Sequence, residues 1–501
     1  MTNSVKHTAV EGAVFLIAQS VISRIAILLS QIILARLLSP QAFGVNAIGG
    51  VVMMIAWTII GFGIDAVYMQ RNTKMPYWET SAFVVTIAQG VVAGLVLILA
   101  GPICARIFNI PDIAPIMLIV GLSLPIVSMS IVSGAKIYSR MQFRWTAGYN
   151  VVEIIGTQSL IIIFALMKLG PYAFFLPIPI MFTFRAIVYF FKAPVVFKYR
   201  ARMRQIIILM RKGGLEFTSR VFAVLIDQGD YMMLGLLSTS QEVGFYFFAF
   251  RLAAMPVRVI ANSLHGVLFS VLARINTDRE RQTIAALKSA QVLSAIATPI
   301  CFIQIAVAAP LFAIFFGHAW DRSILLFQVL SVGLPAEAIA TVSRAHLNAS
   351  GEYRRSMIYS AINATVFFCM VSLGAYVKAS LGVACAVSAF YIVVQTTIFF
   401  RVFPPGSGLV GYLRNIFLWP MVLSAVSAGA GMLAGVLTHP LGNDILQAAW
   451  VGAVSAVTYL SLIWRLQRPM FDELLGIGAK LLRRNRAPDP VADPAAAEHP
   501  L

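Results

Sequence analysis

Charged residues are scarce in this sequence, and acidic residues are scarcer still. Of its 501 residues, 12% are charged and 59% are hydrophobic, and the mean hydropathy is +0.84. A soluble globular protein carries about 25% charged residues. This deficit excludes an ordinary soluble domain. Repeated apolar runs of about 20 residues instead predict an all-α, polytopic membrane protein.

The sequence also lacks the usual marks of an enzyme, a pump or a metalloprotein. Its 4 cysteines have no CxxC spacing, so they indicate neither a disulfide framework nor a metal site. Gly49-Gly50 is not followed by the Lys-Ser/Thr of a phosphate-binding loop. No predicted loop is long enough to bury a core of its own. We therefore expect no enzyme, no metal and no cofactor.

Basic residues outnumber acidic ones by 38 to 20, which gives a net charge of +18. Such an excess occurs in nucleic-acid-binding proteins. Membrane proteins, however, concentrate Lys and Arg in their cytoplasmic loops, and this explanation fits the apolar composition. We expect no nucleic-acid partner.

The apolar runs divide into about fourteen predicted transmembrane helices. They cover residues 10–35, 45–68, 79–101, 113–134, 147–167, 171–191, 214–236, 243–270, 289–316, 323–346, 356–377, 381–400, 411–436 and 445–464. With the N-terminus in the cytoplasm, 28 Lys and Arg residues fall in inside segments and 5 in outside segments. The remaining five lie within spans. This asymmetry predicts that both termini are cytoplasmic.

Short matching segments suggest that the first six spans and the next six are a duplication. The matches are Ser23-Arg24 with Ser219-Arg220, Leu37-Leu38-Ser39 with Leu236-Leu237-Ser238, and Gly44 with Gly244. They predict two pseudo-symmetric six-helix bundles, with a substrate site between them near mid-membrane. The predicted parts are a first bundle at 1–192, a basic cytoplasmic linker at 193–213, a second bundle at 214–401, an additional helix pair at 402–466, and a basic, disordered cytoplasmic tail at 467–501.

Charged side chains inside the predicted spans are the candidate functional residues. Arg251, Arg258 and His265 are seven residues apart, so they share one helix face. A charge near the bilayer centre costs at least about 2.5–3.5 kcal/mol. This face must therefore meet a partner helix or a water-filled cavity rather than lipid.

Four arginines are candidates for binding an anionic group, because a guanidinium fork suits phosphate oxygens. They are Arg24, Arg220, Arg251 and Arg258. The alternative is a buried salt bridge. For Arg24 the acid would be Asp65, Glu153 or Glu337, and for Arg220 it would be Glu216 one turn earlier.

Three acids within the spans, Asp227, Asp230 and Glu337, are candidates for coupling to H⁺ or Na⁺. Pairing with the arginines is the alternative for the two aspartates. Glu153 and Arg185 lie at similar depth in neighbouring spans, which predicts a structural pair. His318 and Trp320 are expected in an outer interfacial turn, with the tryptophan as a membrane anchor.

Several motifs, in order and spacing, resemble the polysaccharide transporter (Wzx-type) flippases of the MOP superfamily, which also contains the MATE drug exporters. The motifs are Ala35–Gly44, Gly61–Arg71, Asp230–Leu237, Val243–Pro256, Phe316–Trp320 and Leu347–Gly351. The resemblance implies a flippase that moves an undecaprenyl-diphosphate-linked oligosaccharide across the bacterial inner membrane. It also implies membrane lipids, a polysaccharide polymerase and chain-length proteins as partners.

Two other functions remain open from the sequence. A MATE-like exporter of cationic molecules would need a net acidic cavity, whereas arginine predominates among the mid-span charges. A non-transporting component of the polysaccharide pathway, or a polymerase, is the second alternative. A polymerase would need a large outside loop, and none is predicted.

Overall fold

The structure, a computed structural model, describes residues 2–60, 77–275, 278–403, 411, 414–438 and 444–484. The described chain is mostly helical and contains no strand among its described residues, which confirms the predicted all-α class. Its helices are long, apolar and joined by short turns. The predicted Asp65 and the Gly61–Arg71 motif lie outside the described residues.

The helices cover most of the predicted spans, and several of them begin well before the predicted first residue. The helices are α1 Thr2–Leu37, α2 Pro40–Ile59, α4 Glu79–Ile107, α5 Ile113–Ser139, α6 Phe143–Leu166, α7 Tyr172–Phe175, α8 Pro177–Lys192, α9 Met203–Leu237, α10 Ser240–Arg274, α11 Arg279–Phe315, α12 Asp321–Ala349, α13 Tyr353–Ala389, α14 Thr396–Val402, α16 Trp419–Thr438, α17 Asp444–Leu466 and α18 Arg468–Arg484. A 3₁₀ turn at His318–Trp320 precedes α12, and π-helical turns at Phe390–Gln395 and Arg414–Leu418 precede α14 and α16.

Among the described residues, 12 helical segments are long and apolar enough to cross a membrane. One of them, Arg354–Val402, has 49 residues, or about 74 Å of helix at 1.5 Å per residue. A bilayer core is about 30 Å thick, so this segment is too long for one crossing. The predicted span 214–236 lies in α9, which is not among the 12. The count of fourteen stays a prediction.

The chain reverses direction within α13. Lys378 and Ala379 have non-helical backbone angles, and Ala379 has φ +45°. A Cβ added at Gly374 would overlap the carbonyl oxygen of Gly382, and one at Gly382 would overlap that of Gly374. In a straight helix these residues would be about 12 Å apart. The glycines therefore let two antiparallel helices meet at a tight turn, as the predicted spans 356–377 and 381–400 require.

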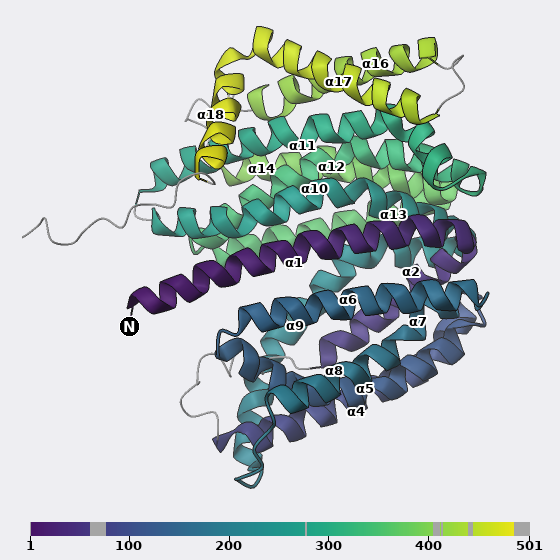
Figure 1. Ribbon diagram of the computed structural model, residues 1–501, viewed down its shortest axis with the longest axis vertical. Helices are drawn as coiled ribbons and strands as arrows, with labels where there is room; N and C mark the ends of the chain where they lie inside the picture. Colours follow the sequence, from purple (N-terminus) through teal and green to yellow (C-terminus); the bar gives the residue numbers. More distant parts are fainter. Residues whose placement is uncertain are drawn as a thin grey trace, which may run out of the picture. The chain divides into compact units, whose positions relative to one another are not determined.

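Contacts divide the chain into two compact units. Unit 1 contains Met1–Met255, Leu311–Gly333 and Met357–Gln395. Within it α4 and α5 lie side by side, and α1 runs along α6 (Figure 1). Glycines bring α4 and α5 close together: a Cβ at Gly94 would lie 2.5 Å from the carbonyl oxygen of Gly121. Backbones this close leave no room for larger side chains.

The start of α9 belongs to unit 1 and extends into the predicted linker 193–213. Leu209 is buried, and Ile206 packs beside it against the cluster of Ala82, Val85 and Val132 on α4 and α5. The apolar side of this basic segment thus contacts protein. The Arg and Lys residues of this segment would also be compatible with a helix on the membrane surface or with a solvated loop. In the structure its apolar side chains pack against α4 and α5 instead.

Unit 2 contains Pro256–Pro310, Leu334–Ser356 and Thr396–Leu501. Within it α16 and α17 form a helix pair (Figure 1). The Tyr459 hydroxyl of α17 donates to the Ala295 carbonyl of α11 over 2.9 Å. Met470 of α18 is buried in the same cluster. The additional helix pair and the first part of the predicted tail are thereby anchored on α11.

The boundary between the units crosses five helical segments, one of them α13 between Ser356 and Met357, and at the other four it lies at a proline or at the end of a π-helical turn. It falls at Pro256 in α10, at Pro310 in α11, beside Pro335 in α12, and after Gln395, where the π-helical turn ends. Proline removes a backbone donor and clashes with the preceding turn, and a π-turn interrupts the regular hydrogen-bond ladder. These helices can therefore bend between their two parts.

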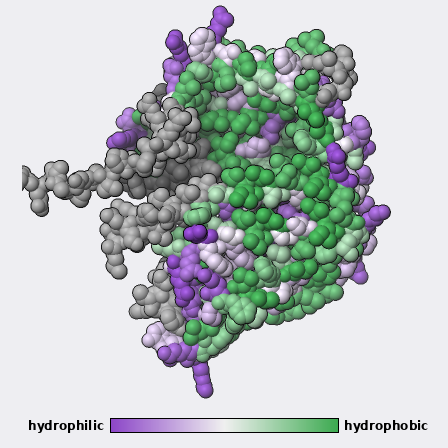
Figure 2. Space-filling model, in the orientation of Figure 1, coloured by the Kyte–Doolittle hydropathy of each residue, from purple (hydrophilic) through white to green (hydrophobic). Residues whose placement is uncertain are grey.

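Apolar residues cover much of the exposed helix surface, with hydrophilic residues gathered toward its margins (Figure 2). Large exposed side chains such as Leu99 (68% exposed) and Leu433 (69%) are typical of this surface. In water such a surface would be unstable, whereas in lipid it is the expected exterior. The protein is a multi-pass membrane protein.

Reporter fusions test the reversal in α13. Gly351 and Lys378 flank the predicted span 356–377, and the charge asymmetry places Gly351 on the cytoplasmic side. We expect a phosphatase fusion after Gly351 to be inactive and one after Lys378 to be active, with the reverse for a cytoplasmic reporter. The same signal at both positions would show that this segment does not cross the membrane.

Candidate functional site

Arg258 and Glu337, two of the predicted site residues, form an ion pair in unit 2. Arg258 lies on α10 and Glu337 on α12, and Arg258 Nη2 is 3.1 Å from Glu337 Oε1. Arg258 is 18 residues from the first residue of α10 and 16 from its last, about 27 Å and 24 Å along the helix. The pair is therefore remote from both helix ends.

The Arg258 side chain is 42% exposed, and that of Glu337 is 20% exposed. A half-exposed guanidinium at this depth would be costly against lipid. Its free surface must consequently meet water or a polar ligand. This geometry supports the prediction that the Arg258 face lines a hydrated space.

Glu337 uses only one of its two carboxylate oxygens in this pair. Its Oε2 atom is buried and has no hydrogen-bond partner among the described residues. A carboxylate oxygen without a partner in a buried place is unfavourable, since it has lost its water. Cys301 of α11 is close enough to feel the charge of Glu337. The second oxygen is thus available to a further ligand.

Arg24 and Arg251 have only weak partners in the contacts that the structure records for them. Arg24, on α1, donates from Nε to Ser20 Oγ over 3.3 Å. The Arg251 guanidinium lies 5.6 Å from the ring centroid of Phe247. Such cation–π contacts stabilise a charge while leaving its hydrogen-bond donors accessible.

Two acids considered as partners of Arg24 are engaged elsewhere. Glu153 accepts from Nε of Arg185 over 3.2 Å, which confirms the predicted structural pair. Glu337 pairs with Arg258. The third acid considered, Asp65, lies outside the described residues.

Asp230 is buried and bonded to tyrosine. Its Oδ2 accepts from the Tyr246 hydroxyl over 2.8 Å, and its Oδ1 accepts from the Tyr231 backbone N–H over 2.9 Å. Asp227, one turn earlier, is exposed. Sequence reasoning missed Tyr246 because it sits in an aromatic run that reads as lipid-facing. The side chains of Arg220, Glu216 and His265 are outside the described residues.

The matched glycines of the two halves face each other in unit 1. A Cβ added at Gly44 would overlap the carbonyl oxygen of Ser240, and one at Gly244 would overlap that of Pro40. Pro40 begins α2 and Ser240 begins α10, so the contact is reciprocal with a constant offset of 200 residues. Reciprocal contacts of this kind mark a local two-fold relation. It supports the predicted duplication.

Aromatic packing closes the same end of these helices. Trp320 is fully buried, with its ring 5.0 Å from that of Phe43 and 3.9 Å from that of Phe248, and its Nε1 donates to the Ala35 carbonyl over 2.8 Å. The expectation that Trp320 anchors the protein at the membrane interface is wrong. Its indole instead joins the α1–α2 turn to α10, because this buried position satisfies both its ring and its N–H.

Arg36 adds a polar tie at this end. It donates from Nε to the Phe315 carbonyl over 2.9 Å and from Nη2 to the Ile314 carbonyl over 2.5 Å. These are carbonyls of the last turn of α11, which lack helical partners and favour a cation. The predicted outside ends of α1, α2, α10 and α11 are thus held together by glycine contacts, aromatic packing and Arg36.

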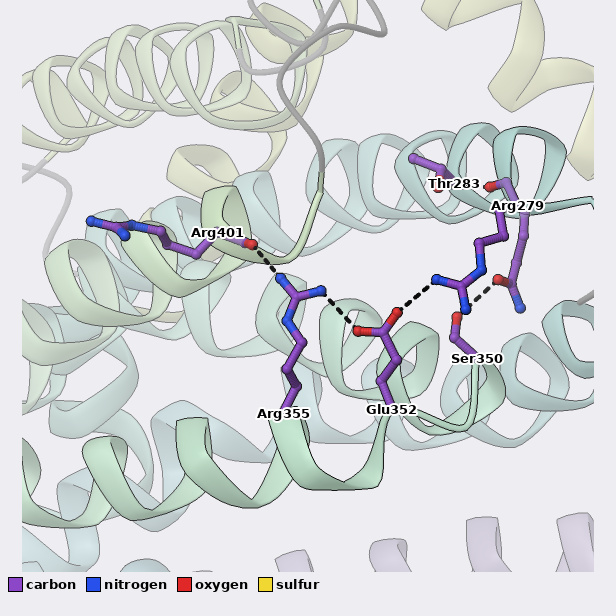
Figure 3. Close-up of polar contacts among 7 residues, drawn as sticks. Arg279, Thr283, Ser350, Glu352, Arg355 and Arg401 are labelled. Atoms are coloured by element: carbon purple, nitrogen blue, oxygen red, sulfur yellow. Dashed lines mark hydrogen bonds and ion pairs between the residues drawn. The ribbon is translucent and has the colours of Figure 1, made fainter.

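An ionic cluster joins the opposite ends of the unit 2 helices (Figure 3). Glu352, between α12 and α13, binds Arg279 Nη1 over 3.0 Å and Arg355 Nη1 over 2.8 Å. Arg355 also donates to the Arg401 carbonyl over 2.9 Å. Hydrogen bonds from Arg355, together with the charges of Arg355 and Arg279, hold the pKa of Glu352 below its usual value of 4.5.

Unit 1 has a comparable cluster with the charges exchanged. Glu79, the first residue of α4, lies 2.9 Å from Lys136 near the end of α5 and accepts from the Val196 N–H over 2.8 Å. Arg279 begins α11, again 200 residues later. An ion pair is therefore present at the start of both α4 and α11. Sequence reasoning missed both clusters, although Glu79 is one of only 20 acidic residues.

Comparison with known proteins agrees with this architecture. Residues 33–325 match the family described as "Polysaccharide biosynthesis protein". The succinoglycan biosynthesis transport protein ExoT of Rhizobium meliloti is 24% identical over 480 residues, covering 93% of each chain. The lipopolysaccharide biosynthesis protein WzxC of Escherichia coli is 20% identical over 452 residues, covering 87% of this chain and 89% of the relative.

Solved structures show the same fold. The lipid II flippase MurJ in an inward closed conformation has a TM-score of 0.69 at 15% identity, covering 91% of this chain and 99% of that one. An inward-facing MATE transporter of the MOP superfamily has a TM-score of 0.60 at 12% identity, covering 77% and 97%. The predicted resemblance to MOP superfamily flippases is confirmed.

Substitution of Gly44 tests the reciprocal helix contact. Gly44→Ala places a methyl group on the Ser240 carbonyl, and we expect it to cost about 1–3 kcal/mol. Gly50→Ala, in the same helix, is the control because no atom lies within 4 Å of its added Cβ. Thermal unfolding in detergent should show a lower midpoint for Gly44→Ala only. Equal midpoints for both variants would exclude a tight contact.

The ionic cluster predicts a pH-dependent stability. A depressed folded-state pKa means that Glu352 stabilises the protein above pH 4.5 and that this contribution is lost as the pH falls through its lower folded value. Glu352→Gln should therefore unfold at a lower temperature than the wild type at pH 7, and the gap should narrow below about pH 4.5. Glu280→Gln, an exposed neighbour, is the control. A gap that is the same at every pH would contradict the assignment.

Proposed function

The chain belongs to the family of polysaccharide biosynthesis proteins, and from this membership we propose that it flips lipid-linked oligosaccharide repeat units across a membrane. The observation that carries the proposal is the 93% two-way coverage by a polysaccharide transport protein, ExoT. The fold shared with the lipid II flippase MurJ supports it. The substrate class that fits is an undecaprenyl-diphosphate-linked oligosaccharide, which joins a lipid tail to a polar, anionic head.

The arginines suit that anionic head. Arg24, Arg251 and Arg258 lie within helical spans, where Arg24 donates to Ser20, Arg251 lies over the Phe247 ring, and Arg258 pairs with one oxygen of Glu337. Arg220 has the matching position of Arg24 in the second half. Guanidinium forks bind phosphate oxygens more strongly than they bind water, and more so away from bulk solvent. The lipid tail would stay in the bilayer while the head crosses beside these residues.

Alternating access accounts for the closed helix end. Gly44, Gly244, Trp320 and Arg36 hold together the ends that carry the predicted outside loops. For the sugar head to leave, this packing must separate while the opposite ends approach. The prolines and the π-turn at the unit boundary supply bending points for that change.

The proposed orientation follows from the charge pattern: with 28 inside and 5 outside basic residues, both termini lie in the cytoplasm. The proposed membrane is the bacterial inner membrane, on the basis of the bacterial relatives ExoT and WzxC. Asp227, Asp230 or Glu337 takes up H⁺ or Na⁺ during the cycle. The protein acts as a transporter rather than an enzyme, and a polysaccharide polymerase with chain-length proteins would use its product.

Replacing Arg24 tests the diphosphate site. We expect Arg24→Ala to abolish polymer export from cells that lack the wild-type chain, and Arg24→Lys to restore only part of it, because an ammonium lacks the bidentate fork. Arg106→Ala, at an exposed site outside the candidate residues, is the matched control. Protein abundance in the membrane fraction must be equal. Normal export by Arg24→Ala would refute this role.

A further inference from the structure

The Arg258–Glu337 pair poses a problem for the proposed function, on which this inference rests. Arg258 is needed by the diphosphate, yet its Nη2 is already held by Glu337 at 3.1 Å. An anionic ligand must therefore share the guanidinium with this carboxylate or displace it. Two anions on one cation in a poorly hydrated space repel each other strongly.

We propose that the diphosphate displaces Glu337 from Arg258, and that the released carboxylate binds one monovalent cation together with the substrate. The charges balance in this exchange. Arg258 remains paired throughout, first with the carboxylate and then with a phosphate oxygen. The negative charge that Glu337 regains is neutralised by the cation. When the diphosphate leaves, Glu337 returns to Arg258 and the cation is released.

Three features of the pair support displacement. The Arg258 side chain is 42% exposed, so a ligand reaches it without unfolding of α10. Only one oxygen of Glu337 is engaged, so a single contact has to be broken. The other oxygen is buried with no hydrogen-bond partner among the described residues, which leaves it ready for a cation.

The surroundings explain why a cation must follow. Among the described residues, Arg258 on α10 is recorded as an ion-pair partner of Glu337, and the buried Cys301 on α11 lies near its charge. Once Arg258 is occupied, Cys301 offers no positive charge. An unpaired carboxylate in a poorly solvated place is unfavourable, so it binds a proton or a metal cation.

The position of the pair connects this exchange to helix bending. Arg258 lies two residues after Pro256, and Glu337 lies two residues after Pro335. The ion pair therefore ties two helices just beyond their bending points. Its opening by the diphosphate frees α10 and α12 to bend independently, which links occupancy of the site to the conformational change.

Displacement makes the cation and the diphosphate cooperative rather than competitive. By linkage, a cation that favours the displaced state raises the affinity for diphosphate, and the diphosphate raises the affinity for the cation by the same factor. A drug exporter in which substrate and cation compete for one acid would show the opposite sign. The sign of this coupling is therefore measurable.

The test is titration calorimetry of the full-length purified protein with farnesyl diphosphate, a short-chain polyprenyl diphosphate. Glu337→Gln removes the competing charge but keeps an acceptor for Arg258. We therefore expect this variant to bind farnesyl diphosphate at least about tenfold more tightly than the wild type. Glu337→Asp should bind with intermediate affinity. The control is Glu153→Gln, which breaks a different ion pair, that with Arg185, and should leave the affinity unchanged. Arg258→Ala should abolish the gain in the Glu337→Gln background.

The cation is identified by repeating the titration at two pH values and two Na⁺ concentrations. If it is a proton, the wild type gains affinity on acidification by more than Glu337→Gln does, since ionisation of the probe affects both equally. If it is Na⁺, the wild type alone responds to Na⁺. Unchanged affinity in Glu337→Gln, or no differential response to either ion, would overturn the exchange while leaving the flippase proposal intact. No binding to any variant would refute the diphosphate site itself.

Discussion

The high cost of a charge in the hydrocarbon core is the constraint on which this structure depends. Each arginine within the helices must be paired, hydrated or stacked. The structure uses all three solutions: Arg185 is paired with Glu153, Arg258 is shared between Glu337 and an exposed surface, and Arg251 lies over Phe247. The need to fold does not by itself explain why the protein keeps such costly arginines in the membrane. Their presence is expected in a protein that lowers the free-energy barrier for moving an anionic head group across the membrane.

Close backbone contacts form the second constraint. Helices in lipid gain no hydrophobic energy from association, so small residues that allow tight packing take a larger part. The reciprocal contact of Gly44 and Gly244 and the turn at Gly374 and Gly382 are of this kind. Such contacts depend on shape and not on charge. They can separate and reform as the helices bend, unlike a buried ion pair, whose separation needs new partners.

The sequence was sufficient for the all-α membrane fold class and for the location of most long helices, because hydropathy is a local signal. It was also sufficient for the Glu153–Arg185 pair, since these opposite charges lie at similar depth in neighbouring spans. It was not sufficient for Trp320, whose position beside an outside turn suggests a membrane anchor although its ring is buried. Nor did it find Tyr246 or the Glu79 and Glu352 clusters. Most of those contacts join residues far apart in the sequence, such as Tyr246 with Asp230 at 16 positions and Glu79 with Val196 at 117, and no local pattern reports them.

The most direct measurement of the central claim is substrate discrimination in reconstituted vesicles. The initial rate of translocation would be compared for a fluorescent polyprenyl-diphosphate oligosaccharide and for a glycolipid with the same sugar but no phosphate. If arginines carry the head across, the diphosphate lipid should cross in a protein-dependent manner while the neutral glycolipid does not. Equal rates for the two lipids, or no protein-dependent crossing of the diphosphate lipid, would contradict it.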